Sequence, residues 1–210
     1  MSEPGRNEPG RNEPGRNEPG GGGSEPGTSE VMTDERTLTG GEALVRALAD
    51  HGVDTVFGIP GTHNLEIYAH LSALGIRHVS TRHEQGAGYA ADGYARVTGR
   101  PGVCVVTSGP ATLNAAAAVG QAYSDSVPLL LVSPGMPLRS TGSGLLHETK
   151  DQSAAMNAVA AYSHRVTSAA EIPAAVARAF AAMTSGRPRP VHLEIPLDVL
   201  DERAAVPPVA

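Results

Sequence analysis

Residues 102–133 read GVCVVTSGPATLNAAAAVGQAYSDSVPLLLVS and contain two apolar runs on either side of an alanine-rich segment. The runs 102–107 and 128–133 are apolar nearly throughout, as expected of strands that are buried on both faces. The intervening segment 111–123 has the composition of a helix. A strand, a helix and a second strand in this order predict a parallel pair joined by a crossover helix.

The same alternation continues in both directions from this stretch. Two capping-box patterns, Thr39-Gly-Gly-Glu42 and Ser168-Ala-Ala-Glu171, mark helix starts. The sequence predicts an α/β fold, a three-layer sandwich in which helices cover both faces of a parallel sheet. We expect further strands at 54–59, 76–80, 163–167 and 191–195, and further helices from the first box to Gly52, at 64–73, at 84–98, at 152–158 and from the second box to 183.

The two ends of the chain differ from this domain, which we place at residues 33–203. Residues 1–32 repeat Glu-Pro-Gly-Arg-Asn three times in tandem and then become glycine-rich. Such a composition offers almost no apolar surface to bury, so we expect a disordered tail. Met32 is a second candidate for the initiator residue. At the other end, Pro207 and Pro208 indicate that 204–210 is a linker-like tail.

Composition excludes several classes of protein. The 210-residue chain has a formal net charge of -6 and a pI near 5.7, which disfavours nucleic acid as a partner. No apolar stretch approaches the roughly 20 residues of a membrane span, and the N-terminus has no apolar signal-peptide core. We therefore expect a soluble cytoplasmic protein. The single cysteine, Cys104, lies in an apolar run and is expected to be a buried hydrophobic residue.

Small and polar residues follow each predicted strand. In open parallel sheets, ligands bind outside the carboxyl ends of the strands, and glycines there let a ligand approach the backbone. The loops that meet at this edge are 58–62, 82–86, 107–110 and 133–135. Ligand binding is therefore expected at the edge of the sheet where these loops meet.

Glu84 is the one carboxylate that begins a helix at this edge, and it allows two interpretations. It could be an ordinary first-turn acid that interacts with the helix dipole. Alternatively it could be a buried carboxyl group, because its helix continues with small residues. Desolvation would then let it share a proton with a nitrogen heterocycle near neutral pH.

A dinucleotide-binding motif is a competing interpretation of the same segment. Residues 86–91 match the pattern G-x-G-x-x-A. That fingerprint needs its glycines in the turn before the helix and an acid at the end of the next strand. Here the glycines lie inside the predicted helix, and the next strand ends in Thr107 and Ser108. Nucleotide binding through this motif is therefore disfavoured.

Residues 82–99, RHEQGAGYAADGYARVTG, resemble the thiamine-diphosphate signature of the acetohydroxyacid synthase, benzoylformate decarboxylase and pyruvate oxidase superfamily. The segments 57–61 (FGIPG), 107–110 (TSGP) and 122–128 (AYSDSVP) resemble further motifs of that superfamily, in the same order. The likeness runs from Leu38 to Leu200. It identifies the chain as similar to the N-terminal pyrimidine-binding (PYR) domain, closest to acetohydroxyacid (acetolactate) synthase large subunits.

The resemblance implies a catalytic role for Glu84. In that superfamily the matching glutamate bonds the pyrimidine N1′ of thiamine diphosphate and favours the imino tautomer, which deprotonates C2 of the thiazolium. The resulting carbanion attacks a 2-oxo acid, and the thiazolium takes up the electrons released on decarboxylation. Pyruvate with a second 2-oxo acid is the first expectation for the substrates, and decarboxylation without carboligation is the alternative.

The resemblance also implies a cofactor-binding role for two glycine-containing loops. Gly58, Pro60 and Gly61 match a loop near the cofactor or substrate, with an ordinary strand-to-helix turn as the alternative. Gly109, Pro110 and Asn114 match the next loop. The usual third residue there is a glycine, whereas this chain has Ala111, which puts a left-handed backbone at that position in doubt.

Two histidines are expected on the substrate side by the same resemblance. His147 stands where relatives place substrate-side residues, and a histidine there could act as an acid or base. An ordinary surface-loop histidine is the alternative. His83 directly precedes Glu84 and could orient its carboxyl group.

Full-length relatives have further domains that this sequence does not resemble. One is a flavin-carrying middle domain in some members, so FAD remains possible in the family. The other is a PP domain that holds the diphosphate through Mg²⁺ with a Gly-Asp-Gly motif, which is absent here. We expect this chain to bind only the pyrimidine half of the cofactor.

Three explanations remain open for a chain of this kind. It could be a subunit that works with a PP-domain-containing subunit or a homologous full-length chain. It could be an inactive fragment. It could be a non-catalytic interaction module that keeps the fold. In the third case the alanine-rich helices that begin at Glu84 and Ala111 would be the pairing surfaces. We expect a homo- or hetero-oligomer.

Overall fold

The computed structural model describes residues 36–207, with side chains from residue 37, and contains a six-stranded parallel sheet. The order of the strands is β3-β2-β4-β5-β7-β6. This arrangement confirms the predicted α/β sandwich, and each of the predicted strands is present. Their bounds are β2 (Thr55–Gly58), β3 (Arg77–Ser80), β4 (Gly102–Val105), β5 (Leu129–Gly135), β6 (Tyr162–Arg165) and β7 (Val191–Pro196).

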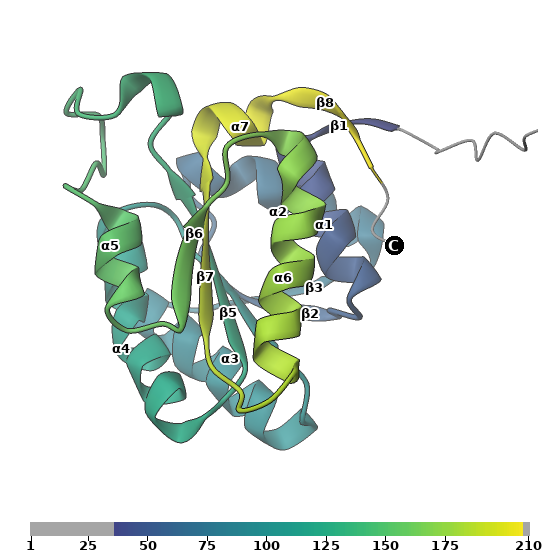
Figure 1. Cartoon of the computed structure of the whole chain (residues 1–210), viewed down its shortest axis with the longest axis vertical. Helices are drawn as coiled ribbons and strands as arrows, with labels where there is room; N and C mark the ends of the chain where they lie inside the picture. The colour runs from purple at the N-terminus through teal and green to yellow at the C-terminus, as the bar shows by residue number, and fades with distance from the viewer. Residues whose placement is uncertain (1–35, 208–210) are drawn as a thin grey trace, which may run out of the picture. The chain divides into compact units, whose positions relative to one another are not determined.

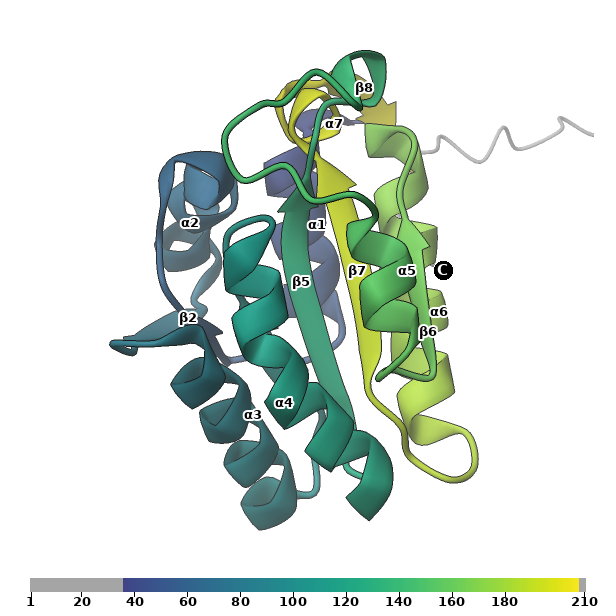
Figure 2. The same ribbon diagram turned by 90° about the vertical axis from the view of Figure 1, so that its left-hand side faces the viewer.

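Helices cover both faces of the sheet and form the outer layers (Figure 1). On one face lie α1 (Gly40–Asp50), α2 (Leu65–Leu71) and α6 (Ile172–Thr184), which share a core of Leu, Ile and Val with the sheet. On the other lie α3 (Glu84–Thr98), α4 (Pro110–Asp125) and α5 (Gln152–Asn157), seen in front in Figure 2. Their core is rich in alanine and includes the fully buried Cys104, whose pKa is raised by burial.

The small residues of α3 and α4 let these two helices pack closely. A Cβ atom added at Gly88 would lie 2.6 Å from the Cβ atom of Ala118, so only a glycine fits at that contact. Ala115 and Ala118 are both completely buried. These two helices therefore pack against each other on one face of the sheet, and their expected pairing with another chain stays a prediction.

The two ends of the domain pair with each other in a way that the sequence did not indicate. Strand β1 (Arg36–Thr39) runs antiparallel to β8 (Arg203–Val206) in a separate two-stranded ribbon. The short helix α7 (Leu197–Asp201) precedes β8. Residues 204–206, which we expected in a linker-like tail, thus belong to a strand. The predicted disordered tail, Met32 and residues 208–210 lie outside the described residues.

One of the two predicted capping boxes forms in half, because the Glu42 carboxylate accepts from Arg46 and not from the Thr39 backbone. The Thr39 hydroxyl accepts the backbone N–H of Glu42 at 3.1 Å, as expected. At Ser168 the prediction is wrong, because its side chain makes no cap bond and α6 begins only at Ile172. The carboxylate of Glu171 instead accepts the Thr167 N–H at 2.8 Å and pairs with His164, so it is drawn away from the helix start.

No helix within residues 36–207 is both long and apolar enough to cross a membrane.

Candidate functional site

The loops that follow the strands gather at one edge of the sheet, toward which the arrowheads of β5 and β7 point at the top of Figure 2. Glu84 lies at this edge as the first residue of α3, just after β3. The glycines at 86 and 88 lie inside α3 and not in the turn before it. The dinucleotide motif is therefore absent as a structural unit, as the sequence indicated.

Glu84 and Asn114 are brought together across the two helices of this face. The side-chain amide of Asn114, on α4, donates a hydrogen bond of 2.9 Å to Oε2 of Glu84. Glu84 is only half-buried, and its neighbours Gln85 and Gly86 are exposed. Of the two interpretations of Glu84, the described chain by itself shows the partly exposed first-turn carboxylate and not a buried carboxyl group.

His83 lies beside Glu84 but acts on the helix backbone. Its Nδ1 accepts the N–H of Gln85 at 3.2 Å, which makes it the N-cap of α3. Within residues 37–207, no hydrogen bond joins the His83 side chain to Glu84. His83 therefore fixes where the helix begins and so where Glu84 stands.

Packing within the fold accounts for the glycine at position 58, at the end of β2. A Cβ atom there would collide with the carbonyl oxygen of Val105 and the hydroxyl of Tyr68, which are themselves bonded at 2.9 Å. The loop around Pro60 that follows is closed by Asn64, whose Oδ1 accepts the Gly61 N–H at 2.7 Å. These contacts hold the loop in place within the fold, and the cofactor-binding role of Gly58, Pro60 and Gly61 stays a prediction.

Gly109 has a backbone conformation that requires glycine. Its φ is 61° and ψ is -116°, and it is the N-cap residue before Pro110, the first residue of α4. A Cβ atom there would collide with the carbonyl oxygen of His147. Ala111 already lies in the helix and is not among the residues with positive φ. The departure from Gly-Pro-Gly is therefore compatible with the loop.

Two further polar residues, His63 and Ser108, lie at the same edge and were not singled out from the sequence. His63 Nδ1 lies 2.6 Å from the Ser108 hydroxyl oxygen, and its ring packs edge-on against that of His147 at 5.5 Å. Burial, and then the nearby His147 charge, lowers the pKa of His63. The one signal that could have revealed His63 is its position in the loop that also contains Gly61.

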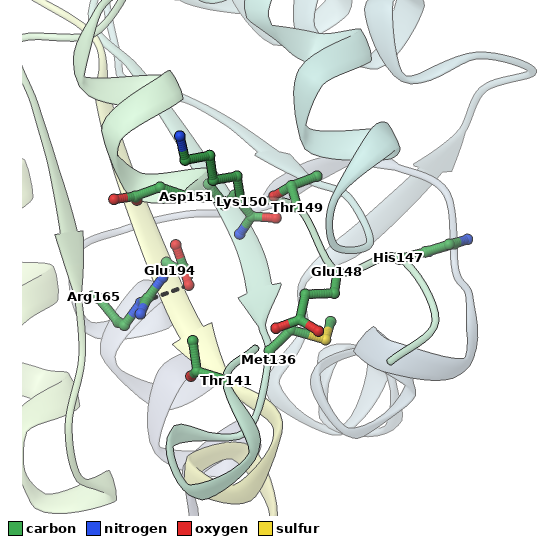
Figure 3. A pocket seen from close by; sticks show the side chains of 10 residues that line it. Met136, Thr141, His147, Glu148, Thr149, Lys150, Asp151, Arg165 and Glu194 are labelled. Atoms are coloured by element: carbon green, nitrogen blue, oxygen red, sulfur yellow. Dashed lines mark ion pairs between the residues drawn. The ribbon is translucent and has the colours of Figure 1, made fainter. Parts of the chain in front are cut away.

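A cavity of about 150 Å³ lies on the other side of His147, under the loop between β5 and α5 (Figure 3). Arg165 and Glu194 face each other in it, with 2.7 Å between Nε and Oε1. His147 points away from these two residues in Figure 3. Neither Glu84 nor Asn114 lines this cavity, so the cavity is separate from the Glu84–Asn114 pair.

No three His, Cys, Asp or Glu side chains in the described part of the chain lie close enough together to hold a metal ion.

Several curated proteins resemble most of the domain. A probable 2-ketoarginine decarboxylase of Pseudomonas aeruginosa is 58% identical over 171 residues, 80% of this chain and 31% of its own length. The acetolactate synthase large subunit of Corynebacterium glutamicum is 44% identical over 167 residues, 77% and 26% of the two chains. The chloroplastic acetolactate synthase of Arabidopsis thaliana is 38% identical over 169 residues, which are 80% of this chain and 25% of that protein. The chain thus spans about a third or less of each of these relatives.

Residues 38–155 match the family described as "Thiamine pyrophosphate enzyme, N-terminal TPP binding domain". The matched segment covers β2 to β5 and the helices α3 and α4, and so includes both Glu84 and Asn114. Thiamine pyrophosphate is another name for thiamine diphosphate, so the match agrees with the resemblance of residues 82–99. The chain belongs to the thiamine pyrophosphate enzyme family, of which it contains the N-terminal TPP-binding domain.

Proposed function

We propose that this chain binds the aminopyrimidine ring of thiamine diphosphate for a 2-oxo acid decarboxylase, with Glu84 as the residue that activates the ring. The hydrogen bond of 2.9 Å from Asn114 to Glu84 Oε2 carries the proposal. It fixes one carboxylate oxygen at the carboxyl edge of the sheet, where ligands of such folds bind. Among residues 37–207, no group bonds the other oxygen, Oε1.

The surroundings of Glu84 suit a flat heterocycle. A Cβ atom added at Gly86, one residue beyond Gln85 on α3, would meet nothing within 4 Å. A ring could therefore lie against this first turn of α3 with its nitrogen toward Oε1. Such a ring would cover the exposed part of Glu84 and remove water from it, which favours sharing of a proton between Oε1 and the ring nitrogen.

The chemistry divides between the cofactor and the protein. When bound, thiamine diphosphate supplies the electron sink for decarboxylation of a 2-oxo acid. Glu84 holds or releases the proton at the pyrimidine N1′, and Asn114 keeps the carboxyl group in place. His147 and His63 lie at the same edge and are proposed to face the substrate side. Gly58, Pro60, Gly61, Gly109 and Pro110 are proposed to shape the cofactor site.

The relatives favour a decarboxylase over a carboligase. The probable 2-ketoarginine decarboxylase is 58% identical to this chain, whereas the acetolactate synthases cited above are 44% and 38% identical. We therefore propose 2-ketoarginine, or a similar long-chain 2-oxo acid, as substrate. Condensation of two 2-oxo acids, as the name acetolactate synthase implies, is the second candidate.

The rest of the cofactor site is proposed to come from another domain. A PP domain, in a partner subunit or elsewhere in a longer protein, would hold the diphosphate through Mg²⁺ in a cytoplasmic homo- or hetero-oligomer. The relatives are about three times as long as the segment that they share with this chain, or longer, which is consistent with this division. If no such domain acts with it, the chain is an inactive fragment or an interaction module.

A chimera tests the proposal in a complete enzyme. Residues 38–207 of this chain replace the matching segment of the Pseudomonas relative, and release of CO₂ is measured with 2-ketoarginine and with pyruvate. Glu84→Gln should lower kcat by at least about 10²-fold, the usual scale of a lost acid–base group. Glu42→Gln is the matched control, since Glu42 is also a first-turn glutamate but lies on α1, on the opposite face of the sheet.

Two results would decide against the proposal. Full activity of the Glu84→Gln chimera would remove Glu84 from the chemistry. Acetolactate formation from pyruvate, without turnover of 2-ketoarginine, would favour the second candidate.

A further inference from the structure

Gln152 is a buried residue of α5 whose side-chain amide reaches the loop that contains Gly109, just before α4. It is the first residue of α5, is only 5% exposed, and none of the functional arguments above uses it. Figure 2 shows α5 beside α4, the helix that carries Asn114. The contacts of Gln152 therefore bear on how α4 begins.

Both ends of the Gln152 amide are bonded. Its Oε1 accepts the Gly109 N–H at 2.6 Å and the Thr112 hydroxyl at 3.2 Å. Its Nε2 donates to the Ser133 hydroxyl at 3.1 Å and to the Pro134 carbonyl at 2.9 Å. Because an N–H can only donate and a carbonyl can only accept, these partners fix the orientation of the amide.

The bonds from Gln152 hold the loop before α4 at Gly109, the residue whose backbone conformation requires glycine. Gly109 has a φ of 61° and is enclosed by the His147 carbonyl on its other side. Thr112 is completely buried, and its single hydroxyl proton is shared between the Thr107 carbonyl at 3.0 Å and Gln152 Oε1 at 3.2 Å. Gln152 thus fixes both the residue that caps α4 and a residue of its first turn.

Asn114 follows in the next turn of the same helix, so its position depends on where α4 starts. We propose that Gln152 is a positioning residue, which holds the start of α4 so that the Asn114 amide meets Glu84. The role of Gln152 in cofactor binding rests on the proposed function, whereas its effect on the Asn114–Glu84 contact does not. The contact can therefore be tested in the chain without cofactor.

Nuclear magnetic resonance of the complete 210-residue chain measures this contact directly. The observable is the change in the Asn114 side-chain amide resonances that Glu84→Gln produces. It is recorded in the wild-type, Gln152→Met and Ser163→Ala backgrounds. Methionine is close in size to glutamine but makes none of its four bonds. Ser163→Ala is the matched control, because Ser163 bonds His192 at 2.6 Å at the far end of the same buried chain of polar groups.

The expected result separates positioning from a general loss of stability. In Gln152→Met, the Gly109 N–H should exchange with solvent roughly tenfold faster, as expected for a lost buried hydrogen bond. The effect of Glu84→Gln on Asn114 should fall by about half or more. In Ser163→Ala, the exchange rate of the Gly109 N–H and the effect of Glu84→Gln on Asn114 should both stay at their wild-type values. This should hold even if Ser163→Ala lowers the melting temperature as much as Gln152→Met does.

Equal effects of Glu84→Gln on Asn114 in all three backgrounds would overturn the proposal. If Gln152→Met does not fold, Gln152→Asn is measured by the same criteria. Asparagine keeps an amide but is one methylene shorter, so it cannot span from Gly109 to Pro134. Normal coupling between Glu84 and Asn114 in that variant would also overturn the role. A different outcome would count against the proposed function. In that outcome, Gln152→Met loses the coupling between Glu84 and Asn114, but the chimera that carries Gln152→Met binds thiamine diphosphate with unchanged affinity.

Discussion

The buried histidine of β7 makes the stability of this domain depend on pH. His192 is completely buried between two hydroxyl groups, with Nε2 2.8 Å from Ser133 Oγ and Nδ1 2.6 Å from Ser163 Oγ. Burial, and then the nearby positive charge of Arg165, lowers the pKa of His192 to about 3, from 6.5 in an exposed histidine. The folded protein thus keeps this imidazole neutral at pH values where the unfolded chain protonates it.

The size of the effect follows from this difference in pKa. Between pH 6.5 and pH 3 the unfolded state binds a proton that the folded state does not, so stability falls as the pH falls. Each pH unit corresponds to about 1.4 kcal/mol, so the free energy of unfolding should drop by about 2 kcal/mol by about pH 5. The contribution is fully present above pH 6.5 and is lost progressively below it.

Urea denaturation at several pH values, on the wild type and on His192→Asn, measures this contribution. Asparagine cannot titrate, so the variant should be less stable at neutral pH but should lose about 2 kcal/mol less between about pH 7 and pH 5. His63, whose pKa is also lowered, titrates in both proteins and cancels in the comparison. Identical pH dependence of the two proteins would refute the argument, as would an NMR titration of His192 near 6.5 in the folded state.

Three further predictions concern single positions. Gly109→Ala should destabilise the domain by about 2 kcal/mol or more in urea denaturation, because alanine strains a positive φ and would collide with the His147 carbonyl. Gly86→Ala, its control in open space within α3, should be neutral or stabilising by up to about 1 kcal/mol, and equal losses at both sites would contradict this. His147→Gln should raise the pKa of His63 in an NMR titration, since it removes a neighbouring positive charge; a lower pKa would be the wrong sign. Cys104 should resist alkylation until urea unfolds the domain, because it is completely buried and burial raises its pKa; rapid labelling of the native protein would count against this packing.

Much of the fold could be predicted because its signals are local. The apolar runs at 102–107 and 128–133 became β4 and β5, and the helix predicted at 84–98 has those bounds in the structure. The ribbon of β1 and β8 could not be predicted in this way. Each strand has four residues, and each is paired only with residues from the opposite end of the domain. No periodicity within a short window carries that information.

The candidate site was predictable only in part, for the same reason. Glu84 follows a strand and starts a helix, and both features are visible in the sequence. The exposure of the Glu84 side chain could not be predicted, because it depends on the empty space beside Gly86 in the folded structure. Gln152 lies 43 residues from Gly109 along the chain, so their hydrogen bond could emerge only from the folded arrangement.

The proposed function depends most on Glu84 as the residue that binds the pyrimidine. The most direct measurement is calorimetric titration of thiamine diphosphate with Mg²⁺ into the chimera with the Pseudomonas relative, with Glu84 intact and as Glu84→Gln. If Glu84 binds the ring, the affinity for thiamine diphosphate should fall about 10-fold or more in the variant, as expected when a hydrogen bond to a charged group is lost. Equal affinity of the two proteins would contradict this role and would leave Glu84 as an ordinary first-turn acid of α3.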